Sequence, residues 1–163
     1  MTGHPQAPRR SAAEQRKLDA ALTELFEQKI TFNRTIGLKV LRLGPDGPQL
    51  GFEMRPELVG HYQHGRLHGG VISATLDALA GLALMVALGE KHADETSEQV
   101  MLRFARLGTI DLRVDYLRPG IGHRFAASAE VLRLGGRIGS AQMRLANEEG
   151  MLIATGAAAY VLS

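Results

Sequence analysis

One run of the sequence combines residue types that can act together on a carbonyl group. His68, Gly69 and Gly70 stand in a row, and the carboxylate of Asp77 follows seven residues after the second glycine. The glycines let a substrate approach backbone N–H groups without obstruction by a side chain. Such N–H groups at the start of a helix stabilise a developing negative charge. The carboxylate can act as a general base or as a nucleophile, and the residue types leave both routes open.

The carboxylate interrupts the most apolar stretch of the chain, which predicts a buried central helix. From Leu67 to Gly89 the only acidic or basic side chain, histidine aside, is that of Asp77. A helix that is apolar on all sides is normally buried, and a carboxylate inside it is costly unless it is paired or used. The stretch is also long enough to span a membrane. Its charge and the polar strands that follow favour a core helix and no membrane span.

Composition and charge narrow the class of protein. The 163 residues are 45% hydrophobic and 22% charged, as in a globular domain, and the formal net charge is only +2. That charge gives no ground for a nucleic-acid partner. The chain has no cysteine, which excludes disulfides, thiolate metal sites and a cysteine nucleophile. Residues 1–10 are polar and lack the apolar centre of a secretory signal, which predicts a flexible tail on a cytoplasmic protein.

A second helix and a set of strands are expected around the central helix. Ser11 and Glu14 have the spacing of a helix capping box, which predicts a helix over residues 11–29. Loops are expected over residues 55–67 and, with one short helix, over residues 90–106. Strands are expected over residues 36–43, 50–54, 109–116, 123–134, 137–147 and 151–162.

The order of these elements indicates the architecture. A long helix separates two early strands from a series of strands that are joined largely by hairpins. This order predicts an α+β fold, with the helix on one face of a curved antiparallel sheet. All of residues 11–163 are expected in this single domain, because the chain is of ordinary domain length.

Three motifs together resemble the hotdog-fold thioesterases of the phenylacetyl-CoA thioesterase type. They are HGG at residues 68–70 with Asp77 on the helix, FNR at residues 32–34 with Gly37, and TIDLRVDYLRP at residues 109–119. The last motif, the NEE turn at residues 147–149 and the insertion at residues 90–106 make the chain similar to the bacterial medium/long-chain acyl-CoA thioesterase subgroup. The resemblance implies a sheet wrapped around the central helix and hydrolysis of medium/long-chain, or aryl, acyl-CoA to a free acid and CoA. It implies no cofactor beyond the CoA of the substrate.

The same resemblance implies roles for individual residues. Asp77 matches the catalytic acid of the family, and the backbone N–H of Gly70, beside Gly69, lies where relatives polarise the thioester carbonyl. Thr109 falls where relatives place a Ser or Thr that helps to position water. His68 matches the motif's histidine, which shapes the turn. Whether His68 also contacts the substrate stays open.

Further candidate contacts flank these motifs. Relatives carry an Asn or Gln shortly before HGG, where this chain reads HYQH, so either Gln63 or a histidine such as His64 is the candidate. Arginine forks suit the phosphates of CoA, and Arg118 and Arg137, each beside a turn, are the preferred candidates. The histidines near HGG lack a carboxylate partner at a suitable spacing, so no metal site is expected.

The spacing on the central helix also predicts an assembly. Gly70 and Asp77 stand about 10 Å apart along a helix axis, so one carbonyl group cannot lie close to both. If both act on one substrate, they come from different protomers of a homodimer, or of a tetramer that contains such dimers. Two other functions stay open: an acyl-CoA-binding sensor without turnover, and the acyl hydratase or dehydratase chemistry found on the same fold.

Overall fold

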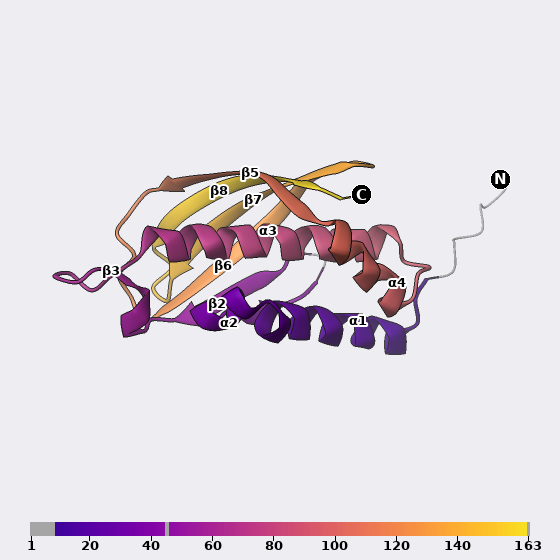
Figure 1. The fold of residues 1–163 in the computed structure, drawn as a ribbon, viewed down its shortest axis with the longest axis horizontal. Helices are drawn as coiled ribbons and strands as arrows, with labels where there is room; N and C mark the ends of the chain where they lie inside the picture. Colours follow the sequence, from indigo (N-terminus) through magenta and orange to yellow (C-terminus); the bar gives the residue numbers. More distant parts are fainter. Residues whose placement is uncertain (1–8, 45, 163) are drawn as a thin grey trace.

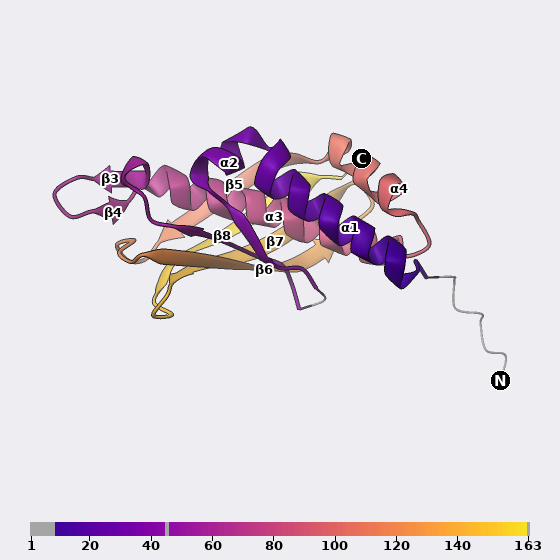
Figure 2. The same ribbon diagram turned by 90° about the horizontal axis from the view of Figure 1, so that it is seen from below.

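The computed structural model describes residues 9–44 and 46–162, and shows a sheet that curves around one long helix (Figures 1 and 2). This helix, α3, runs from Gly69 to Lys91. Six antiparallel strands form the main sheet in the order β1-β2-β6-β7-β8-β5. The strands are β1 (Lys39–Arg42), β2 (Gln49–Glu53), β5 (Gly108–Tyr116), β6 (Arg124–Leu134), β7 (Ile138–Asn147) and β8 (Leu152–Val161). The predicted α+β architecture is confirmed.

The N-terminal helix is also confirmed, and it packs beside α3 (Figure 2). Helix α1 (Ala12–Glu24) continues as a π-helix, η1 (Leu25–Lys29). Ser11 caps α1 by accepting the N–H of Glu14 at 3.2 Å. The carboxylate of Glu14 does not close the predicted box, because it accepts hydrogen bonds from Lys17 and from the N–H of Ser97.

Two stretches differ from the prediction. A short helix, α2 (Thr31–Ile36), was not predicted and includes the first residue of the first predicted strand. It ends at Gly37, whose φ of 84° gives a left-handed cap. The strand therefore begins only at Lys39. The predicted loop before α3 contains a 3-10 turn and a small hairpin of β3 (Val59–His61) and β4 (Arg66–Leu67).

Most of α3 is buried, as a central helix requires. By length and composition α3 qualifies as a membrane span, but 61% of its most apolar 18-residue window is buried inside the fold, as in a core helix. The incompletely buried positions in its first half recur along one strip, as helical geometry requires. This strip contains Gly70, Ser73, Ala74, Asp77 and Ala78. The single charge of the helix thus lies on its open side.

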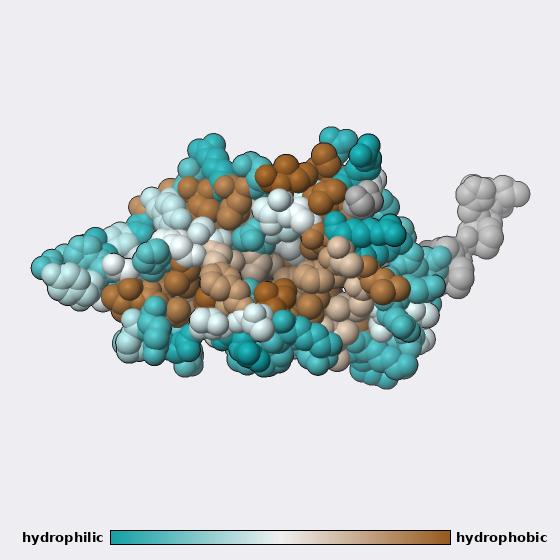
Figure 3. Space-filling model, in the orientation of Figure 1, coloured by the Kyte–Doolittle hydropathy of each residue, from teal (hydrophilic) through white to brown (hydrophobic). Residues whose placement is uncertain are grey.

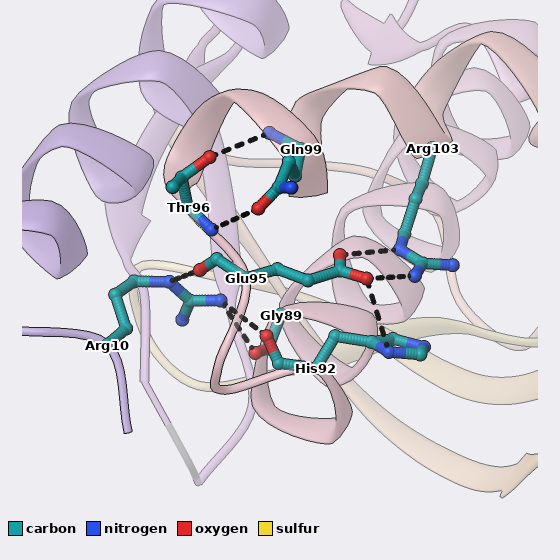
Figure 4. Close-up of polar contacts among 7 residues, drawn as sticks. All are labelled: Arg10, Gly89, His92, Glu95, Thr96, Gln99 and Arg103. Carbon is teal, nitrogen blue, oxygen red and sulfur yellow. Dashed lines mark hydrogen bonds and ion pairs between the residues drawn. The ribbon is translucent and has the colours of Figure 1, made fainter. Parts of the chain in front are cut away.

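A polar network fixes the far end of α3 (Figure 4). The guanidinium of Arg10 donates to the backbone oxygens of Gly89, His92 and Glu95. The carboxylate of Glu95 pairs with Arg103, whose hydrogen bonds hold the pKa of Glu95 below its usual value. This network ties α4 (Ser97–Leu102) and the 3-10 turn η3 (Arg103–Arg106) to α3 and α1. The first eight residues of the predicted tail lie outside the described residues.

Candidate active site

The carboxylate of Asp77 is held by two hydroxyl groups from the sheet. Thr109, near the start of β5, donates to Oδ1 at 3.0 Å. Tyr160, near the end of β8, donates to the same Oδ1 at 2.6 Å, and its hydroxyl lies 2.6 Å from the backbone oxygen of Asp77. Burial and the hydrogen bond to Asp77 raise the pKa of Tyr160, so its phenol stays protonated and remains a donor. Among residues 9–44 and 46–162, Oδ2 has no hydrogen-bond partner.

A hollow of about 250 Å³ opens beside this carboxylate. Phe26, Ile30 and Phe32 line it from the N-terminal helices. Phe104 and Leu107 line it from η3 and the residue that precedes β5. A carboxylate with one unengaged oxygen beside apolar walls can act on a carbonyl group whose hydrocarbon part lies in the hollow. We call this space the acyl hollow.

At the start of α3, the free N–H is not the one that the motif predicts. His68 caps the helix, and its Nδ1 accepts the N–H of Gly70 at 2.8 Å. The backbone oxygen of His68 accepts the N–H groups of Val71 and Ile72. Within the described part of the chain, the N–H of Gly69 has no acceptor. The donor open to a ligand is therefore that of Gly69, and Gly70 becomes a donor only if the imidazole of His68 turns away.

This cap explains why the motif needs its second glycine. A Cβ at Gly70 would lie 2.9 Å from Nδ1 of His68, which is too close for the observed hydrogen bond. The geometry therefore shows a loop-fixing contact for His68. A direct contact of His68 with the substrate stays a prediction.

Strand β5 touches both parts of the site. Thr109 contacts Asp77, and Tyr116, at the other end of the strand, donates to the backbone oxygen of Gly69 at 3.0 Å. Asp77 and Gly69 lie eight residues apart on α3, about 12 Å along its axis. Within one chain, no single carbonyl group lies close to both. This agrees with the separation expected from the spacing in the sequence.

Sequence reasoning missed the two tyrosines. Tyr160 lies 83 residues after Asp77, and no spacing in the sequence links them. The available signal was that Tyr160 is the only aromatic residue in a strand of mostly small residues. Tyr116 was recognised as a strand residue, but its hydrogen bond to the start of α3 depends on where β5 lies in the sheet.

The predicted contacts before the motif lie at the start of α3 and not beside Asp77. Gln63 and His64 are exposed in the turn between β3 and β4, and this hairpin projects beyond α3 (Figure 1). The hairpin packs on the helix start, because a Cβ at Gly60 would lie 2.7 Å from Cα of His68. The His61 and His64 rings lie 4.7 Å apart. Across the described ranges, no group of three His, Asp or Glu side chains is arranged to hold a metal ion.

The two candidate arginines lie at opposite ends of the sheet. Arg118 follows β5 and donates to the backbone oxygen of Leu152 at 2.9 Å. Arg137 lies in the turn between β6 and β7, where its backbone oxygen accepts the N–H of Leu162. Arg118 is therefore on the same side of the molecule as the helix start, and Arg137 is not.

Known proteins share both the sequence and the fold of this chain. The model of the Thioesterase superfamily matches residues 64–154. The chain is 40% identical over 139 residues to the medium/long-chain acyl-CoA thioesterase YigI of Escherichia coli, covering 85% of this chain and 90% of that protein. A Shewanella oneidensis protein related to the thioesterase superfamily superposes with a TM-score of 0.87 at 37% identity, covering 94% of this chain and 100% of that one. A thioesterase family protein from Silicibacter pomeroyi gives a TM-score of 0.68 at 26% identity, covering 87% and 96%. These similarities confirm the hotdog fold.

Proposed function

Because this chain belongs to the thioesterase superfamily, we propose that it hydrolyses acyl-CoA thioesters to a free acid and CoA. The observation that carries the proposal is the carboxylate of Asp77, which lines an apolar hollow, with Oδ1 held by two hydroxyls and Oδ2 without a hydrogen-bond partner among the described residues. The Escherichia coli relative acts on medium/long-chain acyl-CoA, which supports the same substrate class here. The aromatic walls of the acyl hollow also suit aryl acids.

In the proposed reaction, Oδ2 of Asp77 is the reacting atom of the enzyme. Thr109 and Tyr160 hold Oδ1 and so fix the direction of Oδ2. Oδ2 either takes a proton from water that attacks the thioester carbon, or attacks that carbon itself to form an anhydride that water then hydrolyses. Both routes expel the thiolate of CoA and give the same products. The reaction needs no cofactor besides the CoA that the substrate carries.

The start of α3 supplies the positive end of the site in this proposal. The N–H of Gly69 donates to the thioester oxygen, where the helix dipole also favours negative charge. The N–H of Gly70 joins it when the imidazole of His68 moves. Gln63, His64 and Arg118 lie on this side of the molecule, so we assign the CoA group to them. Arg137 of the same chain lies at the other end of the sheet, beside the start of β5, and is not assigned to this group.

We further propose that each active site is shared between two protomers. Strand β5 is an edge of the sheet, and its outer side has no partner strand among the residues described. A nine-residue edge with exposed Ile110 and Tyr116 is an open template for another strand. A largely apolar band also crosses this face of the molecule over α3 (Figure 3). A second copy of the chain fits such a surface.

An antiparallel β5–β5 pair would bring the two parts of the site together. In such a pair, the Thr109 end of one strand faces the Tyr116 end of the other, so Asp77 of one protomer approaches the partner's Gly69. A twofold axis at Leu112 also places each Asp111 opposite the partner's Arg113, which gives two pairs of opposite charge. An axis one residue further on would place Asp111 opposite the partner's Asp115. We therefore favour the axis at Leu112.

Mixed dimers test the shared site. Asp77→Ala removes the acid, and Gly69→Pro removes the free N–H while keeping a residue that suits the first position of a helix. Each variant alone should be inactive in release of free thiol from acyl-CoA. Co-expressed at equal amounts, they should regain roughly a quarter of the wild-type activity, since half of the dimers have one intact site. Mixed dimers that are isolated and inactive would exclude shared sites.

The same assay separates the rival functions. Saturable acyl-CoA binding by the wild-type protein with no release of thiol would favour a sensor. Hydration of an enoyl-CoA with no thiol release would favour a hydratase function.

We place the enzyme in the cytoplasm, where its proposed substrates occur. A tetramer of two such dimers is compatible with this arrangement, because it leaves the paired β5 edges intact.

A further inference from the structure

We propose that Phe104, packed on Phe26, forms the floor of the acyl hollow and limits the length of the acyl chain that the enzyme accepts. This inference rests on the proposed thioesterase function and adds a chain-length determinant to it. The floor is built by the N-terminal helices and by the α4–η3 segment, which lie outside the sheet. The position of this floor is therefore independent of the HGG motif and of Asp77.

Burial distinguishes the floor of the hollow from its mouth. Phe26 is only 2% exposed, whereas Phe32 is 61% exposed. The rings of Phe26 and Phe104 meet edge to face, with centroids 6.0 Å apart. The hollow thus opens at the exposed Phe32 and is bounded by the buried Phe26, on whose ring the half-buried Phe104 packs. A chain whose carbonyl group lies at Asp77 would extend along these aromatic walls.

Both walls are held in place by hydrogen bonds. The buried side chain of Asn33 donates to the backbone oxygen of Phe26 at 3.1 Å and so fixes η1 against α2. On the other side, Arg103 pairs with Glu95, and Arg103 directly precedes Phe104 in η3 (Figure 4). A rigid floor can reject a chain that is too long, whereas a mobile one would adapt to it.

The size of the hollow limits the chain that it can hold. At about 250 Å³ it lies below the range of about 300–1,000 Å³ that is typical of ligand pockets. We therefore expect the preference to rise with chain length up to a limit set by Phe104 and then to level off or fall. Below that limit, each added methylene should tighten binding by about fourfold.

The test compares chain-length profiles. In Phe104→Ala, the loss of a six-carbon ring should move the optimum of kcat/KM to acyl-CoA substrates that are longer by about four carbons. Ala78→Leu, which adds carbon to the wall, should move the optimum to shorter chains. Leu102→Ala is the matched control, because Leu102 is 69% exposed and lies outside the acyl hollow. Its profile should equal that of the wild type.

Binding gives a second readout that does not need turnover. Asp77→Ala protein should bind acyl-CoA with an affinity that rises with chain length and then levels off, and adding Phe104→Ala should extend that rise. Should Phe104→Ala fail to fold, Phe104→Leu, which keeps an apolar side chain but removes the ring, should still move the optimum to longer chains. Active variants with the wild-type profile would overturn the inference and leave the thioesterase function standing. Wild-type protein that hydrolyses no acyl-CoA would overturn the proposed function itself.

Discussion

Replacement of Tyr160 by phenylalanine would test how the carboxylate of Asp77 is positioned. The change keeps the ring in the core and removes only the hydroxyl, which lies 2.6 Å from Oδ1. A hydrogen bond to a charged group contributes about 1.5–3 kcal/mol. Since each 1.36 kcal/mol in the barrier is tenfold in rate, kcat/KM should fall by about 10- to 150-fold if the whole contribution is expressed in the transition state. Thr109 would still hold Oδ1, so some activity should remain.

The assay is the release of free thiol from acyl-CoA, with kcat and KM measured separately. The hydroxyl holds Oδ1 of Asp77 in place, so its loss should lower kcat because Oδ2 is then less firmly directed at the substrate. KM should change less than kcat, because the substitution removes the hydroxyl that contacts the acid and keeps the ring that lines the acyl hollow. Thr109→Val is the matched comparison, and its effect should be smaller because that hydrogen bond is longer, at 3.0 Å.

The result that would refute this reasoning is a folded Tyr160→Phe enzyme with kcat/KM within about threefold of wild type. Tyr160 would then act only through packing. A lowered Tm with unchanged kcat and KM would lead to the same conclusion. Circular dichroism of the variant would separate a local change at the carboxylate from a general loss of structure.

Two further substitutions test the helix start and the network at the other end of α3. Gly70→Ala should displace the imidazole of His68, because the new Cβ would lie 2.9 Å from Nδ1. We expect the free energy of unfolding, measured with denaturant, to fall by about 1 kcal/mol and kcat to be reduced. Unchanged values would show that the cap is dispensable. Glu95→Gln should lower stability at pH 7 by about 0.5–1 kcal/mol, because it weakens the pair with Arg103. Since that pair lowers the pKa of Glu95, its contribution is present above about pH 4.5 and is lost as pH falls through the lowered value. The Tm curves of wild type and variant should therefore converge in acid, and a constant difference at all pH values would contradict the assignment.

Much of the fold follows from local sequence patterns. The apolar stretch around Asp77 predicts α3 because helical burial depends on residues three and four positions apart. The alternation of apolar and polar residues from Thr109 to Tyr116 predicts β5, because successive side chains of a strand point to opposite faces of the sheet. The short helix α2 was missed, because the left-handed cap at Gly37 that separates it from β1 has no periodic signal.

The candidate site likewise has features that follow from local sequence and features that depend on the tertiary structure. The sequence by itself determined that HGG begins a helix, that Asp77 lies on it, and that the two are too far apart to serve one carbonyl group, because helical rise is a local property. Only the tertiary structure decided that Tyr160 meets Asp77, that the free N–H at the helix start is that of Gly69, and that β5 lies at the edge of the sheet. Contacts between distant segments depend on strand order and packing of the whole chain, which residue spacing does not encode.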